Sequence, residues 1–156
     1  MQLDRKHVGQ SVFVFMLVFI WGSAGQIAQA GELERALEYR QGVMNVLGWN
    51  MKSMGNMMKG KQPYDAEAFA VHAGDLAKAA TLDVLPGFPE DSDEGETDAR
   101  ADIWLDFDDF KQKLEDLRRA SQTLSEIASG GDKAAMSDAL GKTGKACKAC
   151  HDSYKD

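Results

Sequence analysis

Cysteine and histidine are both scarce in this sequence, with two cysteines and three histidines among 156 residues. A structural zinc site needs four ligands, and the chain offers only the two cysteines, His151 and His72. His72 lies beside the apolar stripe of residues 66–82, where a solvated boundary residue is more common than a ligand. A thioredoxin-like dithiol would need a preceding strand, and no segment shows the alternation typical of one. These absences disfavour a zinc site and a thioredoxin-like redox site.

An excess of positive charge is also absent, because 18 Lys and Arg residues face 25 Asp and Glu residues and the formal net charge is −7. An acidic surface argues against binding to nucleic acid or to anionic lipid. It permits docking to a basic protein partner, although most acidic surfaces serve only solubility. The sequence identifies no particular redox partner.

The chain has no apolar run of the ~20 residues that a membrane-spanning helix requires. The apolar run from Val12 to Trp21 is half that length and follows a positive segment, Arg5-Lys6-His7. Small and polar residues then lead to Ala28-Gln29-Ala30, the pattern of a signal-peptide cleavage site. We therefore predict that residues 1–30 are a cleaved signal peptide, with an uncleaved membrane anchor as the alternative.

Cleavage after Ala30 would leave residues 31–156 as one domain of ordinary size. The removed segment carries a net charge of +1 from Asp4, Arg5 and Lys6, so the mature chain is near −8. An export signal predicts a location in a bacterial periplasm, without membrane attachment after cleavage.

The most informative residues are Cys147-Lys148-Ala149-Cys150-His151, in the last ten positions. C-x-x-C-H is the spacing that attaches a c-type haem. Two thiols one helical turn apart can each form a thioether to one porphyrin, and the adjacent histidine can ligate the iron. We therefore predict one covalent haem c per chain, with Cys147 and Cys150 as attachment sites and His151 as the metal ligand. A chance match on a helical tail is the alternative, and the export signal argues against it.

Apolar residues recur in steps of three and four over four segments, near residues 32–59, 66–82, 103–128 and 132–155. Asp65 and Asp132 are predicted N-caps of the second and fourth segments. Short connections make the first pair and the last pair of helices antiparallel. The sequence thus predicts an all-α protein, an antiparallel up-down four-helix bundle with a covalently attached haem c.

The connection between the second and third predicted helices, residues 83–102, is long for a compact domain. It contains six acidic residues between Glu90 and Asp98, so it could bind a cation or a partner, although a solvated crossover is the more common use of such a segment. Phe88 and Trp104, near its ends, either cover the edge of a haem or belong to the core.

Arg40 interrupts the apolar seam of the first helix, which otherwise consists of leucine and methionine at heptad spacing. An unpaired guanidinium on a core-facing stripe is costly, so it needs an anionic partner. A haem propionate is one such partner, and Arg is well shaped to bind a carboxylate. The alternative is that Arg40 extends to solvent at the edge of the bundle.

These features together resemble the cytochrome c prime family, the class II c-type cytochromes. The resemblance covers the whole predicted mature chain and is carried by Tyr39–Met44, Lys59–Lys61, Pro63–Asp65, Phe110–Lys113 and Gly144–His151. Class I cytochromes c, by contrast, carry the haem motif near the N-terminus.

The resemblance implies a role for each candidate residue. Cys147 and Cys150 would hold the haem, His151 would be the proximal ligand, Arg40 would lie near a propionate, and Met44 would overhang the distal face. In most members the iron is high-spin and pentacoordinate and binds nitric oxide and carbon monoxide. Such proteins usually form homodimers through the first two helices.

Met44 separates two functions that the resemblance leaves open. As a lid over a vacant distal face it would belong to a gas-binding protein that is also capable of one-electron transfer. As the sixth ligand it would make the protein a low-spin His/Met electron carrier. We expect no enzymatic activity, because the positions beside Met44 offer no distal histidine or carboxylate for acid–base chemistry. At Lys155 relatives often have arginine, which puts a proximal gas-handling role in doubt.

Overall fold

The computed structural model describes the backbone of residues 9–156 and the side chains of residues 29–156. It contains α1 (Gly9–Met58), α2 (Ala66–Ala79), the 3-10 turn η1 (Leu85–Gly87), α3 (Asp102–Leu105), α4 (Phe107–Ala128) and α5 (Lys133–Tyr154). The predicted cleavage stays a prediction, and the side chains of the apolar run lie outside the described residues. Within the described part, no helix has both the length and the apolar character needed to cross a membrane.

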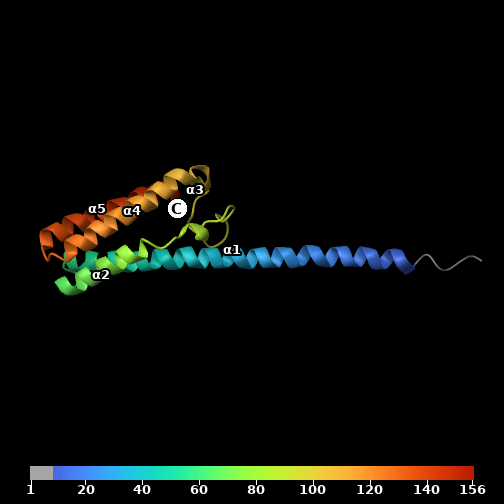
Figure 1. The fold of residues 1–156 in the computed structure, drawn as a ribbon, viewed down its shortest axis with the longest axis horizontal. Helices are drawn as coiled ribbons and strands as arrows, with labels where there is room; N and C mark the ends of the chain where they lie inside the picture. The colour runs from blue at the N-terminus through green and yellow to red at the C-terminus, as the bar shows by residue number, and fades with distance from the viewer. Residues whose placement is uncertain (1–8) are drawn as a thin grey trace, which may run out of the picture.

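The all-α bundle is confirmed. α2 folds back along α1, and α4 and α5 form a second antiparallel pair beside it (Figure 1). The two pairs are joined mainly through α2 and α4, and α1 runs in the opposite direction to α5. Over residues 9–156 the only strand-like pairing is an isolated antiparallel bridge between Ala99 and Lys155.

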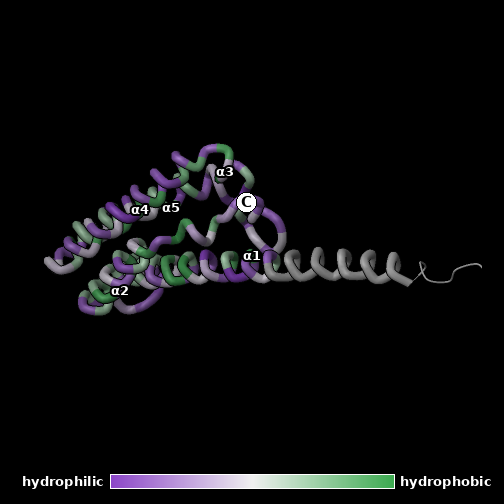
Figure 2. Tube along the Cα trace, turned by 45° about the vertical axis from the view of Figure 1, so that its right-hand side comes forward, coloured by the Kyte–Doolittle hydropathy of each residue, from purple (hydrophilic) through white to green (hydrophobic). Residues whose placement is uncertain are grey.

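The core lies along the predicted apolar seams, and hydrophobic and hydrophilic residues alternate along α4 and α5 in Figure 2. Its fully buried side chains come from every long helix and include Met54, Phe69, Leu76, Leu124 and Met136. Burial of such side chains is the main favourable contribution to folding. The apolar residues at steps of three and four therefore identify most of the interior, although on α1 Val43 and Met57, beside the predicted stripe, are more deeply buried than Met44 and Met51.

The helix boundaries follow local capping groups. Asp65 accepts hydrogen bonds from two amides at the start of α2, and Asp132 accepts one from Ala135 at the start of α5, as predicted. Our prediction of one continuous third helix is wrong, because two helices, α3 and α4, occupy that segment. Asp106 leaves the helical conformation between them, and its side chain caps α4 by accepting from the amide of Asp109.

Two other boundaries also differ from the prediction. The second helix ends at Ala79 rather than near Leu82, and the hydroxyl of Thr81 donates to the Lys78 carbonyl there. The first helix begins at Gly9 rather than near residue 32, because the structure includes the segment that the prediction removed.

We expect Asp132→Ala to lower the free energy of unfolding by about 1 kcal/mol, because it removes the N-cap of the helix that carries the haem motif. Urea unfolding of the holoprotein at an unchanged m-value would measure this loss. Asp138→Ala is the control, because that carboxylate pairs with the exposed Lys142 at the surface and its loss should leave the free energy of unfolding almost unchanged. Equal losses in the two variants would contradict the capping role.

Candidate functional site

The haem motif occupies the last two turns of α5. Cys147 and Cys150 are both free and half-buried, one turn apart, and Cys150 packs against the hydrophobic core. Burial raises the pKa of Cys147, and burial together with Cys147 raises the pKa of Cys150 to about 11. Both sulfurs therefore stay protonated and uncharged at neutral pH.

His151 lies on the same helix, with its side chain largely exposed. Partial burial and the positive charge of Lys155 lower its pKa, while Asp152 acts in the opposite sense. A lowered pKa favours the neutral imidazole, which is the form that binds a metal.

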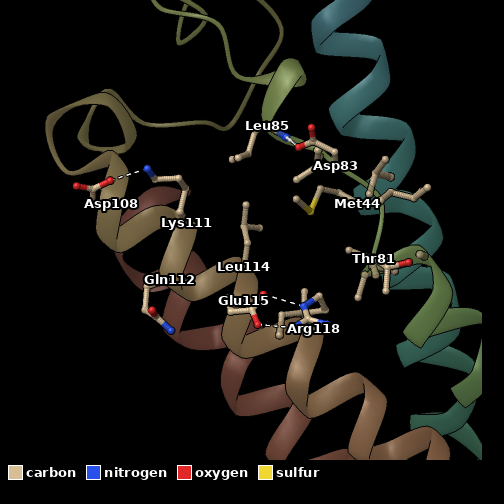
Figure 3. A pocket seen from close by; sticks show the side chains of 17 residues that line it. Met44, Thr81, Asp83, Leu85, Asp108, Lys111, Gln112, Leu114, Glu115 and Arg118 are labelled. Carbon is tan, nitrogen blue, oxygen red and sulfur yellow. Dashed lines mark hydrogen bonds and ion pairs between the residues drawn. The ribbon is translucent and has the colours of Figure 1, made fainter.

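Met44 lines a cavity of about 430 Å³ between α1, the end of α2 and α4. Its thioether points into the cavity toward Leu85 and Leu114 (Figure 3). The side chains that α1 contributes to this cavity are all apolar, namely Val43, Met44 and Leu47. Most charged groups come from α4, where Asp108 pairs with Lys111 and Glu115 pairs with Arg118, and Asp83 adds a carboxylate from the connection after α2. The cavity therefore has an apolar wall at Met44 and a polar wall on α4.

The motif residues of α5 do not line this cavity, but Met44 and His151 lie at the same level of the bundle. α1 and α5 touch where the terminal methyl of Met51 lies 3.8 Å from the point that a Cβ on Gly144 would occupy. Met44 precedes Met51 by seven residues and His151 follows Gly144 by seven, about 10.5 Å along each helix on the same face. Because α1 and α5 run in opposite directions, the two steps lead the same way along the bundle.

Arg40, one turn before Met44, is 3% exposed, so the alternative that it extends to solvent is wrong. Its Nη1 donates to the carbonyl of Gly87 at 3.0 Å and to the hydroxyl of Ser92 at 2.7 Å. Its Nη2 donates to the carbonyl of Ser92 at 2.6 Å and to the hydroxyl of Thr97 at 2.7 Å. All four acceptors are neutral and belong to the connection between α2 and α3, which we call the long link (residues 80–101).

The positive charge of Arg40 therefore lacks a counter-ion at close range. Among the side chains of residues 29–156, no carboxylate lies within ion-pairing distance of its guanidinium. Burial lowers the pKa of Arg40, and the more distant charge of Asp93 acts in the opposite sense. Since the pKa of an arginine side chain ordinarily lies far above neutral, the side chain stays charged, and a buried charge without a partner is costly.

A row of aromatic rings connects Arg40 to the end of α5. The guanidinium lies 4.8 Å from the ring centre of Phe88, which packs edge-on against Phe110, and Phe110 packs edge-on against Tyr154. The hydroxyl of Tyr154 donates to Asp109 at 2.7 Å. Phe88 and Phe110 are buried in the core. Of the two alternatives predicted for Phe88, it therefore has at least the core-packing role.

The long link is partly buried against the helices, while its six acidic residues, Glu90, Asp91, Asp93, Glu94, Glu96 and Asp98, are all exposed, as expected of a solvated crossover. Val84, Phe88 and Ser92 are buried, and the indole of Trp104 donates to the carbonyl of Phe88 at 3.3 Å. Sequence reasoning missed Ser92 and Thr97 as partners of Arg40, because nothing in an irregular segment indicates which residues face a helix.

The zinc interpretation is not supported. Within the described residues, no three His, Cys, Asp or Glu side chains come together in a way that could hold a metal ion. His72 instead hydrogen-bonds through Nδ1 to Asn50 at 2.8 Å, which links α2 to α1 away from the cysteines.

The residues present fit a covalently attached haem. Two uncharged thiols and a neutral imidazole stand together on one helix, Met44 lies at the level of the imidazole, and the apolar wall of a cavity adjoins Met44. The buried guanidinium of Arg40 requires an anion, and a propionate is one. The thiols and imidazole of α5 and the uncompensated charge of Arg40 are thus both consistent with the same cofactor.

Comparison with known proteins gives consistent matches over this region. A family model described as Cytochrome C' matches residues 35–155. A cytochrome c' of Halomonas halodenitrificans is 38% identical over 130 residues, which cover 80% of this chain and 98% of the relative. The structure of cytochrome c prime from Shewanella frigidimarina aligns with a TM-score of 0.76 at 38% identity, over 80% of this chain and 97% of that one.

A third match is a nitric oxide complex of a mutant cytochrome c prime from Alcaligenes xylosoxidans. It aligns with a TM-score of 0.71 at 33% identity, over 80% of this chain and 96% of that one. Arg40, Met44 and the haem motif all lie within the range that the family model matches.

We expect Tyr154 to ionise only at strongly alkaline pH. Burial raises the pKa of Tyr154 above the ordinary value of 10.0. The hydrogen bond to Asp109 and the charge of Asp109 raise it further. A pKa that folding raises stabilises the folded state while the phenol is protonated, so this contribution is complete below pH 10 and is lost as the pH rises further. Alkaline titration of the holoprotein, followed by tyrosinate absorbance, should show this delayed component.

Tyr154→Phe should remove the delayed component, and Asp109→Asn should shift it to lower pH. Tyr64→Phe is the matched control and should leave it in place. A delayed component that survives in Tyr154→Phe would show that another phenol is responsible.

Proposed function

Since the chain belongs to the cytochrome c prime family, whose members hold haem c covalently, we propose that it is a periplasmic protein that binds nitric oxide and carbon monoxide at an open sixth site. Bound haem c supplies an iron that can change oxidation state and take an axial ligand. The observation that carries the proposal is the position of Met44, level with His151 and on the apolar wall of a cavity. The periplasmic location rests on the export signal in the sequence.

Each residue of the site has a separate task in this proposal. Cys147 and Cys150 fix the cofactor to α5, and His151 holds the iron from the proximal side. Met44 covers the distal side, and the adjoining cavity gives its flexible thioether room to move aside. Arg40 places its charge near a propionate, which would supply the counter-ion that its neutral partners do not.

The apolar wall around Met44 supports nitric oxide and carbon monoxide as ligands. Val43, Met44 and Leu47 offer no hydrogen-bond donor to a bound gas, and oxygen binding depends on such a donor in the distal pocket. A relative from Alcaligenes xylosoxidans, with the same fold, has been solved as a nitric oxide complex. We infer the same ligand class for this chain.

The second candidate function is electron transfer by a low-spin iron that Met44 ligates. The same observation favours it, because a methionine level with the proximal histidine is placed to approach the iron from the opposite side. Axial His/Met ligation would raise the reduction potential and close the gas site.

The absorption and EPR spectra of the oxidised holoprotein, followed by addition of nitric oxide to the reduced form, test the proposal. We expect a high-spin signal and a spectral shift on adding the gas. A low-spin signal with a methionine-to-iron charge-transfer band, inert to the gas, would establish the second candidate.

Met44→Ala should leave a pentacoordinate protein high-spin and speed nitric oxide association by about tenfold or more, which corresponds to about 1.4 kcal/mol of the barrier. If Met44 ligates the iron, the same variant should convert a low-spin spectrum to a high-spin one and lower the potential. Met58→Ala is the control, since Met58 lies on the same seam, outside the cavity and two turns beyond the Met51–Gly144 contact. If the spectrum, the reduction potential and the nitric oxide kinetics of Met44→Ala match those of the wild type, Met44 serves only to pack the core.

We propose that the protein is a homodimer through α1 and α2. Six large apolar side chains are exposed among the described residues, and four of them surround one hollow: Val46 and Trp49 on α1, Val71 on α2 and Leu82 just beyond the end of α2. Contiguous exposed apolar surface of this kind marks interaction sites. A second copy can cover such a patch with the same patch, as twofold symmetry requires.

Trp49→Glu should raise the dimer dissociation constant at least about tenfold, because it places a charge in the middle of the patch. Sedimentation equilibrium over a range of protein concentrations would measure it. Leu105→Glu is the matched control, because Leu105 is 83% exposed on α3, away from the patch. A dimer that persists in Trp49→Glu would place the interface elsewhere.

A further inference from the structure

The long link is attached to α1 one turn before Met44. Arg40 donates four hydrogen bonds to the link, and the side-chain amide of Gln41 donates to the backbone carbonyl of Glu96 at 2.7 Å. Gly87 approaches the helix so closely that an added Cβ would lie 2.8 Å from the Cβ of Arg40. The attachment therefore combines hydrogen bonds with close backbone packing.

The same link is attached to α5 one turn after His151. The amide of Arg100 donates to the carbonyl of Tyr154 at 3.1 Å, and the amide of Asp156 donates to the carbonyl of Asp98 at 3.0 Å. The ammonium of Lys155 lies 2.7 Å from the carboxylate of Asp98. These contacts include the isolated bridge between Ala99 and Lys155.

Almost no chain separates the two attachments. Thr97 accepts the hydrogen bond from Arg40, and the next residue, Asp98, pairs with Lys155. Adjacent Cα atoms are about 3.8 Å apart, so this span has no slack. The hydroxyl of Thr97 also accepts from the amide of Ala99 at 3.1 Å, which fixes the short span itself.

α1 and α5 are thus held together on both sides of the Met44–His151 level. On one side, two turns away, Met51 packs against Gly144. On the other side, one turn away, the helices are connected through Arg40, Thr97, Asp98 and Lys155.

We propose that Thr97 and Asp98 are positioning residues, which fix the separation of α1 from α5 and so determine how closely Met44 covers the iron. Neither residue touches the iron or the gas in this arrangement. They act through Arg40 on α1 and through Lys155 on α5, and loosening them lets α1 move away from the proximal helix. The proposal rests on the distal role of Met44 described above.

The test compares the holoproteins of Thr97→Val and wild type. Thr97→Val keeps the shape of the side chain but removes the acceptor shared by Arg40 and Ala99. Nitric oxide association to the reduced form should become at least threefold faster, and the amides of Arg100 and Asp156 should lose protection from hydrogen exchange. Thr123→Val is the matched control, because its hydroxyl bonds only within α4, and it should change neither quantity.

Gly87→Ala is a second variant, which displaces the link from α1 by steric conflict with Arg40 and should speed association in the same way. Gly141→Ala is its control, since nothing lies within 4 Å of the added methyl group. Amides that lose protection while the gas kinetics and spectrum stay unchanged would overturn the proposal. So would unchanged protection, because the link would then not depend on Thr97.

The wild-type spectrum keeps this test separate from the proposed function. If the wild type is low-spin and inert to nitric oxide, gas binding fails as the function. Thr97→Val should then show an increased high-spin fraction and a lowered reduction potential, as the Met44 ligand is released more easily. A low-spin Thr97→Val variant with an unchanged potential would overturn the positioning role in that case as well.

Discussion

The buried charge of Arg40 constrains the structure around the candidate site. A guanidinium that cannot reach water must find acceptors within the protein, and Arg40 finds four of them in a segment that has almost no regular secondary structure. Those bonds hold the long link against α1, and they leave the cation above the ring of Phe88. Because all four acceptors are neutral, the arrangement remains one charge short, and an anionic cofactor group would complete it.

The core and the link have different roles. Apolar seams join α1 to α2, α2 to α4 and α4 to α5, and they account for most of the buried side chains. They do not complete the packing near Met44, where Leu114 and Leu117 of the α4 stripe remain only partly buried beside a cavity. The side chains thus leave room beside Met44, at the level of His151.

The sequence predicts the features that depend on residues close together in the chain. Steps of three and four identify the helices, Asp65 and Asp132 cap them as expected, and the haem motif is complete within five residues. The prediction fails where the apolar pattern continues past a local break. Leu82 extends the pattern of α2 but lies exposed beyond its end, and Asp106 interrupts the third helix by capping the next one. The seam indicates that Arg40 needs a partner, but Ser92 and Thr97 lie more than 50 positions away in a segment without periodicity.

The short span between Thr97 and Asp98 has a consequence for the lengths of chain that this fold can accept. Residues 93–96 are exposed, so an insertion there would only enlarge a surface turn, at a small cost in loop entropy. An insertion of one residue between Thr97 and Arg100 would add up to about 3.6 Å of slack between two helices that are otherwise held without any. Natural variation in the length of the link should therefore be concentrated before Thr97, while the few residues that follow keep a constant length.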